Sequence, residues 1–172
     1  MKKTTPLSPA GQYDRDGFLI IHDLLSPEEC EKLKIEARRV LDEHCPDKRS
    51  VYVHVAVVSE LYRALAEDKR VVKMLKPVMP HGIMFMSDKI VYKSAEKASP
   101  TPPHVDFYYW PNTRPKLSVW IPLDDTTAEN GTLTVVPGSH KRDWKMVRHA
   151  PDKGEFHNSI DDGDWKDGDV VT

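Results

Sequence analysis

A histidine and an aspartate separated by one residue are the most chemically informative feature of this sequence. In His104-Val105-Asp106, an extended backbone would direct the two outer side chains to the same face, because residues two apart project to one side of a strand. A converging imidazole and carboxylate can bind one metal ion, and they are two of the three ligands of a 2-His-1-carboxylate site for Fe(II). The same tripeptide also fits an ordinary surface strand, so the spacing alone leaves both interpretations open.

The composition excludes several function classes. The chain has 172 residues, which suggests one domain, and its 25 Lys and Arg against 27 Asp and Glu give a net charge of −2. That balance shows no basic excess for nucleic acid or an anionic membrane, and no apolar run approaches the roughly 20 residues of a membrane span. Two cysteines, Cys30 and Cys45, are too few for a disulfide framework and favour a reducing, cytoplasmic location. We therefore expect a small-molecule partner, with no prediction of oligomeric state.

The first half of the chain carries helix signals. Ser26 can cap a helix that has Pro27 at its first position, and Glu29 can complete a capping box. Apolar residues then recur at helical spacing and predict an amphipathic helix to about His44. A short strand is expected just before it, at 17–21. Two shorter helices are expected at 59–66 and 69–76.

The second half of the chain reads as strands. The strand-like segments are 83–86, 89–93, 116–123, 132–136 and the opening of a strand at 169–172. Asn130-Gly131 is a hairpin-type turn signal, and 137–139 is a second turn. Helices followed by an antiparallel sheet predict an α+β fold. We expect a double-stranded β-helix (a cupin-like jelly roll) with the N-terminal helices packed on one sheet.

Several longer stretches carry a family resemblance. They are Tyr13–Leu19 with Leu25–Cys30, Val91–Lys93 followed by His104–Asp106, Leu117–Asp125, Glu129–Leu133 and Val136–Lys141. In this order they resemble the phytanoyl-CoA dioxygenase family of Fe(II)/2-oxoglutarate oxygenases, and together they cover nearly the whole chain. The resemblance implies a non-haem dioxygenase that uses Fe(II), 2-oxoglutarate and O2 to hydroxylate a small-molecule C–H bond, while 2-oxoglutarate is decarboxylated to succinate.

The resemblance also assigns site residues. It implies that His104 and Asp106 bind the metal and that Lys89, Val105 and Trp120 line the 2-oxoglutarate pocket. For Lys89 the alternative is an exposed strand lysine, and for Trp120 it is a core aromatic residue. In halogenating relatives a small residue replaces the carboxylate so that chloride can bind iron, and the presence of Asp106 therefore favours hydroxylation.

Two further family residues are expected beyond the end of the sequence. The resemblance places a second histidine ligand and a 2-oxoglutarate-binding arginine shortly after the stretch 168–170, whereas the sequence ends at Thr172. We therefore expect residues 1–172 to be a single jelly-roll oxygenase domain whose C-terminal strands are missing. Two alternatives remain open: an inactive truncated jelly-roll binding module, and a cupin-like metalloenzyme that uses His149 or His157. His140, in the 137–139 turn region, is not a convincing substitute ligand.

Overall fold

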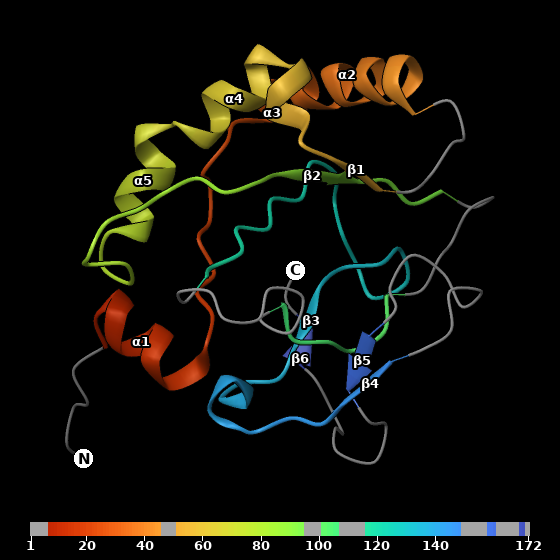
Figure 1. Ribbon diagram of the computed structural model, residues 1–172. Coiled ribbons are helices and arrows are strands. Elements are labelled where there is room, and N and C mark those ends of the chain that lie inside the picture. The colour runs from red at the N-terminus through yellow and green to blue at the C-terminus, as the bar shows by residue number, and fades with distance from the viewer. Residues whose placement is uncertain are drawn as a thin grey trace.

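The computed structural model describes residues 7–45, 51–94, 101–106, 116–148, 158–160 and 169–170. The helices are α1 (Pro9–Asp16), α2 (Pro27–His44), α3 (Val55–Val58), α4 (Glu60–Ala66), α5 (Lys69–Leu75) and the 3-10 helix η2 (Ser139–Lys141). The strands are β1 (Val51–Val53), β2 (Lys89–Val91), β3 (Thr134–Val135), β4 (Met146–Arg148), β5 (Asn158–Ile160) and β6 (Asp169–Val170). Helices α2, α3 and α4 lie on one side of the β1–β2 pair, the β3–β6 and β4–β5 pairs lie on the other, and α5 lies beyond one end of β1–β2 (Figure 1).

Helix α2 confirms the predicted N-terminal signals. The Glu29 N–H donates to Ser26 Oγ at 3.3 Å, and Glu29 Oε2 accepts from the Ser26 N–H at 2.8 Å, which forms the reciprocal capping box. The apolar stripe faces inward as predicted, with Leu33, Ala37 and Val40 buried. The helix also ends at His44, as expected. Local sequence signals therefore define the longest helix in the described part of the chain.

Helices α1, α4 and α5 each begin after a residue whose side chain caps the helix. Helices α4 and α5 fall within the predicted segments, and they begin after Ser59 and Asp68, whose side chains accept backbone N–H groups. Helix α1 was not predicted, although Ser8 caps it and a proline occupies its first turn. Its C-cap is Gly17, which is in the left-handed conformation (φ 84°). No strand follows at 17–21, so the strand prediction for that segment was wrong. None of the helices in the described ranges is both long and apolar enough to cross a bilayer.

The strands of the described segments form three separate two-stranded antiparallel pairs. Val51 pairs with Val91 in β1–β2, Thr134 with Val170 in β3–β6, and Met146 with Ile160 in β4–β5; these registers define the pairs. Strands β2, β3 and β6 lie inside predicted segments, whereas β1, β4 and β5 were not predicted. The segments 83–86 and 116–123 are not strands here, because strand propensity needs a neighbouring strand to complete a ladder. The complete jelly roll remains a prediction.

Strand β2 is tied to the helical layer at its start. The His54 N–H donates to the Asp88 carbonyl at 2.8 Å, and the Ala56 N–H donates to Asp88 Oδ2 at 2.9 Å. A carboxylate at the first turn of a helix satisfies N–H groups that have no partner within the helix. These contacts fix the residue that precedes Lys89 and hence the start of β2.

Helix α1 is tied to the turn that leads into η2. The Gly138 N–H donates to the Asp16 carbonyl at 2.9 Å, and His140 Nε2 donates to the Asp14 carbonyl, 126 residues away in sequence, at 3.1 Å. The His140 ring packs so closely on Gly17 that a Cβ there would lie 2.7 Å from His140 Cγ. We call this the Gly17–His140 contact. It brings together the first and last segments on which the family resemblance rests.

Candidate metal centre

His104 and Asp106 converge in the structure. His104 Nε2 lies 3.2 Å from Asp106 Oδ1, and the two side chains are 19% and 37% exposed. The one-residue spacing predicted this convergence, although the segment 101–106 contains no described strand. The two candidate donor atoms therefore face each other, with partial access to solvent.

Two backbone carbonyls hold the His104 ring and the segment that carries it. His104 Nδ1 lies 2.8 Å from the Pro102 carbonyl oxygen, which can only accept, so Nδ1 carries the proton and the lone pair of the neutral ring is on Nε2. The Pro103 carbonyl accepts the Ile160 N–H of β5 at 2.7 Å, which anchors the segment that carries the pair. A histidine whose distal nitrogen donates to a carbonyl is the usual arrangement of a metal ligand.

Ser118 holds the other end of the carboxylate. Its Oγ donates to Asp106 Oδ2 at 2.5 Å, and this leaves Oδ1 directed at His104. Sequence analysis did not single out Ser118 or the Pro102 carbonyl as parts of the site. Ser118 lies 12 residues after Asp106, in a segment whose pairing with the site depends on tertiary structure. No local spacing rule could have found it.

The pair is electrostatically coupled. The hydrogen bond that His104 donates to the Asp106 carboxylate raises the pKa of His104, burial opposes this effect, and the hydrogen bond to the Pro102 carbonyl adds to it. The hydrogen bond from His104 lowers the pKa of Asp106 to about 2, with a further contribution from Ser118. The positive charge of Lys89 lowers both pKa values, so its field reaches the pair. A metal ion would bind the neutral form of His104 and the ionised form of Asp106, so metal binding competes with protonation of His104 Nε2.

The donor atoms fit adjacent positions on one octahedral ion. Two ligand atoms at about 2.1 Å from a metal, at right angles, lie about 3.0 Å apart. The observed separation of His104 Nε2 and Asp106 Oδ1 is 3.2 Å. An imidazole nitrogen with a carboxylate oxygen is also a donor set that suits Fe(II). Among the described residues no group of three His, Cys, Asp or Glu side chains could hold a metal, so the pair is a partial site.

The other predicted site residues stand as follows. Lys89 is exposed on β2 and acts on the pair through its charge, a position that agrees with both interpretations of this residue. Val105 is half-buried between the two candidate ligands. Trp120 is 42% exposed in this chain, and both interpretations of it stay open. The assignment of these three residues to a 2-oxoglutarate pocket remains a prediction.

Of the other histidines considered as ligands, His140 is the one that the structure describes, and it does not join the pair. His140 Nε2 donates to the Asp14 carbonyl, and the ring packs on Gly17. His149 and His157 lie outside the residues that the structure describes. The cupin-like alternative that uses either of them therefore remains untested.

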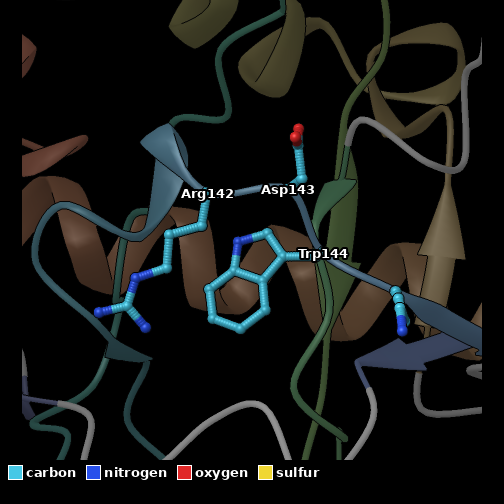
Figure 2. Close-up of a pocket in the computed structure, with 4 residues that line it drawn as sticks. Arg142, Asp143 and Trp144 are labelled. Carbon is cyan, nitrogen blue, oxygen red and sulfur yellow. The ribbon is translucent and has the colours of Figure 1, made fainter.

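A shallow hollow follows η2. It has a volume of about 340 Å³ and is lined by four consecutive residues, Arg142, Asp143, Trp144 and Lys145. Figure 2 shows the Arg142 side chain beside the Trp144 indole, with the Asp143 carboxylate on the opposite side of the chain. The Arg142 guanidinium carbon lies 5.6 Å from the Trp144 ring centroid, and Trp144 Nε1 donates to the Ser139 carbonyl at 2.9 Å. None of these residues belongs to the His104–Asp106 pair.

Three relatives found by comparison with known proteins are named as dioxygenases. The ectoine dioxygenase of Streptomyces coelicolor is 31% identical over 147 residues, which cover 74% of this chain and 48% of that protein. The ectoine dioxygenase of Streptomyces anulatus is 29% identical over 166 residues, 86% of this chain and 55% of that protein. A probable alpha-ketoglutarate-dependent hypophosphite dioxygenase of Stutzerimonas stutzeri is 31% identical over 104 residues, 59% of this chain and 35% of that protein. The chain thus spans about half the length of the ectoine dioxygenases, and no solved structure matches.

A family model agrees with these relatives. The model described as Phytanoyl-CoA dioxygenase (PhyH) matches residues 13–172, which include the converging His104 and Asp106 and both sides of the Gly17–His140 contact. Because this match covers nearly the whole sequence, the chain belongs to the phytanoyl-CoA dioxygenase family.

Proposed function

We propose that this chain forms part of a non-haem Fe(II)/2-oxoglutarate-dependent dioxygenase that hydroxylates a C–H bond of a small molecule. The observation that carries the proposal is the 3.2 Å approach of His104 Nε2 to Asp106 Oδ1, in a geometry that fits adjacent positions on one ion. Family membership and relatives named as dioxygenases support the same chemistry. The proposal includes the jelly-roll fold of the whole domain, with further ligands supplied from outside the described residues.

The described residues have distinct roles in this proposal. His104 would bind Fe(II) through Nε2, since its Nδ1 is committed to the Pro102 carbonyl, and Asp106 would bind through Oδ1. The bound iron would couple the decarboxylation of 2-oxoglutarate to the oxidation of substrate by O2. Lys89 supplies a positive charge that a carboxylate of 2-oxoglutarate would neutralise, and Val105 and Trp120 would line the co-substrate pocket.

The relatives suggest which substrates to test first. Two of them are named for ectoine and one for hypophosphite, and none of these three is named for an acyl-CoA thioester. We therefore propose ectoine, which offers C–H bonds, as the first candidate for this chain, and hypophosphite, which offers only P–H bonds, as the comparison substrate. The Asp106 carboxylate fills the position that chloride needs in halogenating relatives, so the expected reaction on a C–H substrate is hydroxylation.

An anaerobic Fe(II) titration tests the proposed metal site. We expect the complete protein, with every ligand of the ion present, to bind Fe(II) and to develop a visible charge-transfer band when 2-oxoglutarate is added. His104→Ala and Asp106→Ala should lose the band, whereas His22→Ala, an exposed histidine elsewhere in the chain, should retain it. Absence of Fe(II) binding in the wild type, or equal binding in His104→Ala, would contradict the proposal and favour the inactive binding module.

Product analysis tests the type of reaction. With a C–H substrate that is turned over in the presence of chloride, we expect a hydroxylated product, because Asp106 excludes chloride from the ion. The measurement is mass spectrometry of the product, with Asp106→Ala as the comparison variant. A chlorinated product from the wild-type chain would contradict the hydroxylase assignment.

A further inference from the structure

We propose that Ser118 is a positioning residue that makes Asp106 bind its metal ion through one oxygen only. This inference rests on the proposed function, because it concerns how the His104–Asp106 pair receives the ion. None of the motifs on which the resemblance rests assigns a role to this hydroxyl. The observation that carries it is the hydrogen bond from Ser118 Oγ to Asp106 Oδ2, the oxygen that faces away from His104.

The chemistry of a carboxylate explains why such a residue is needed. An ionised carboxylate has two equivalent acceptor oxygens, and it can bind a cation through one oxygen or through both. The Ser118 hydroxyl is the donor at 2.5 Å, which occupies Oδ2 and leaves Oδ1 for the ion. Monodentate binding keeps one more coordination position open for a co-substrate, which a 2-His-1-carboxylate site requires.

Exposure of the carboxylate makes the hydrogen bond important for its orientation. The Asp106 side chain is 37% exposed, so packing alone does not fix the rotation of its carboxylate. The imidazole is oriented separately, through Nδ1 and the Pro102 carbonyl. Ser118 comes from a different segment of the chain, and it therefore fixes Asp106 relative to the body of the fold. Groups that orient a metal ligand in this way contribute about 10–100-fold to metal affinity.

Co(II) titration of three serine variants tests the inference. We expect Ser118→Ala to weaken Co(II) binding by about 10–100-fold relative to wild type. Ser118→Thr keeps the hydroxyl at an exposed position with room for a methyl group, and it should bind like the wild type. Ser139→Ala is the matched control, because the backbone carbonyl of Ser139, and not its side chain, accepts the Trp144 hydrogen bond. It should leave Co(II) affinity unchanged.

Infrared difference spectroscopy supplies a readout that general destabilisation does not change. With carboxyl-labelled aspartate, the asymmetric and symmetric carboxylate stretches that shift on Co(II) binding lie far apart for monodentate binding and close together for bidentate binding. We expect the wide separation in the wild type and in Ser118→Thr. The separation should narrow in Ser118→Ala, where Asp106 Oδ2 is released.

The outcomes separate this inference from the proposed function. If the wild type binds no Co(II), or if His104→Ala binds equally well, the metal site and the role of Ser118 are both wrong. If the wild type binds and Ser118→Ala matches it in affinity and infrared separation, only the role of Ser118 is wrong. A Ser118→Thr variant as weak as Ser118→Ala would also overturn it. If Ser118→Ala does not fold, Ser118→Cys, nearly isosteric but a poor donor, takes its place with the same criteria.

Discussion

Replacement of Gly17 by alanine should destabilise the protein through the Gly17–His140 contact. Gly17 has a φ of 84°, and an L-residue in the left-handed conformation costs roughly 1–2 kcal/mol. The new Cβ would lie 2.7 Å from His140 Cγ, so the ring must move. Its hydrogen bond to the Asp14 carbonyl would then be lost, which adds about 1 kcal/mol. We expect the free energy of unfolding to fall by about 2–3 kcal/mol.

Two other glycines separate the backbone effect from the steric one. Gly138 also has a positive φ of 74°, but an added Cβ would meet no closer atom than the Arg15 carbonyl oxygen at 3.8 Å, so Gly138→Ala should cost only the backbone contribution of about 1–2 kcal/mol. Gly11 lies inside α1, where an added Cβ would meet nothing closer than 3.4 Å. Gly11→Ala should be neutral or stabilising by about 0.5–1 kcal/mol, because alanine is the better helix former.

Urea unfolding followed by circular dichroism measures these differences, and a double-mutant cycle with His140→Ala isolates the contact. In the His140→Ala background, Gly17→Ala should lose its steric contribution and cost about 1 kcal/mol less than in the wild type. The reasoning fails if Gly17→Ala is no more destabilising than Gly138→Ala. It also fails if the cost of Gly17→Ala is the same with and without the His140 ring.

Two further predictions concern the helical layer. Val40 is completely buried, so Val40→Ala should lower the free energy of unfolding by about 2–3 kcal/mol. Val57 is 72% exposed, so Val57→Ala should change the free energy of unfolding by less than about 0.5 kcal/mol. Thermal denaturation of both variants measures the difference. The hydrogen bond from Arg39, with one from Ser59, lowers the pKa of Glu36 from 4.5 to about 2. Since its pKa is lower in the folded state, ionised Glu36 stabilises the fold above about pH 5, and this contribution is lost as the pH falls towards 2. The melting temperature should therefore fall more steeply over that range in the wild type than in Glu36→Gln, and parallel curves would exclude the effect.

The sequence predicted helices better than strands for a physical reason. Helix α2 is specified locally, since Ser26, Glu29 and the apolar stripe all act within its own 18 residues. A strand is stable only when a partner supplies its ladder, and that partner is distant in sequence. The segment 83–86 shows the consequence: it is apolar and strand-like, yet Met84 is 85% exposed and no described strand pairs with it. Strand β1, by contrast, was missed and is stabilised by pairing with β2.

The same distinction between local and long-range contacts applies to the candidate site. The convergence of His104 and Asp106 follows from a spacing of two residues and was predicted from it. The contact with Ser118 joins different segments, and it depends on how the chain packs after both segments have formed. The Gly17–His140 contact likewise joins two recognisable motifs whose proximity no sequence spacing indicates. Local chemistry could therefore be predicted, whereas the groups that orient it could not.

Two consecutive prolines give the His104–Asp106 pair a rigid base. The sequence has 14 prolines, a residue type that is common in turns and loops, and Pro102 and Pro103 do more than interrupt secondary structure. Each has a fixed φ and no N–H group, so each presents only a carbonyl to its surroundings. The Pro102 carbonyl orients the His104 ring, and the Pro103 carbonyl binds the N–H of Ile160, which is buried in β5. The unfolded chain has less conformational freedom at these positions, and the donor atoms are therefore positioned with a smaller loss of entropy than a flexible loop would require.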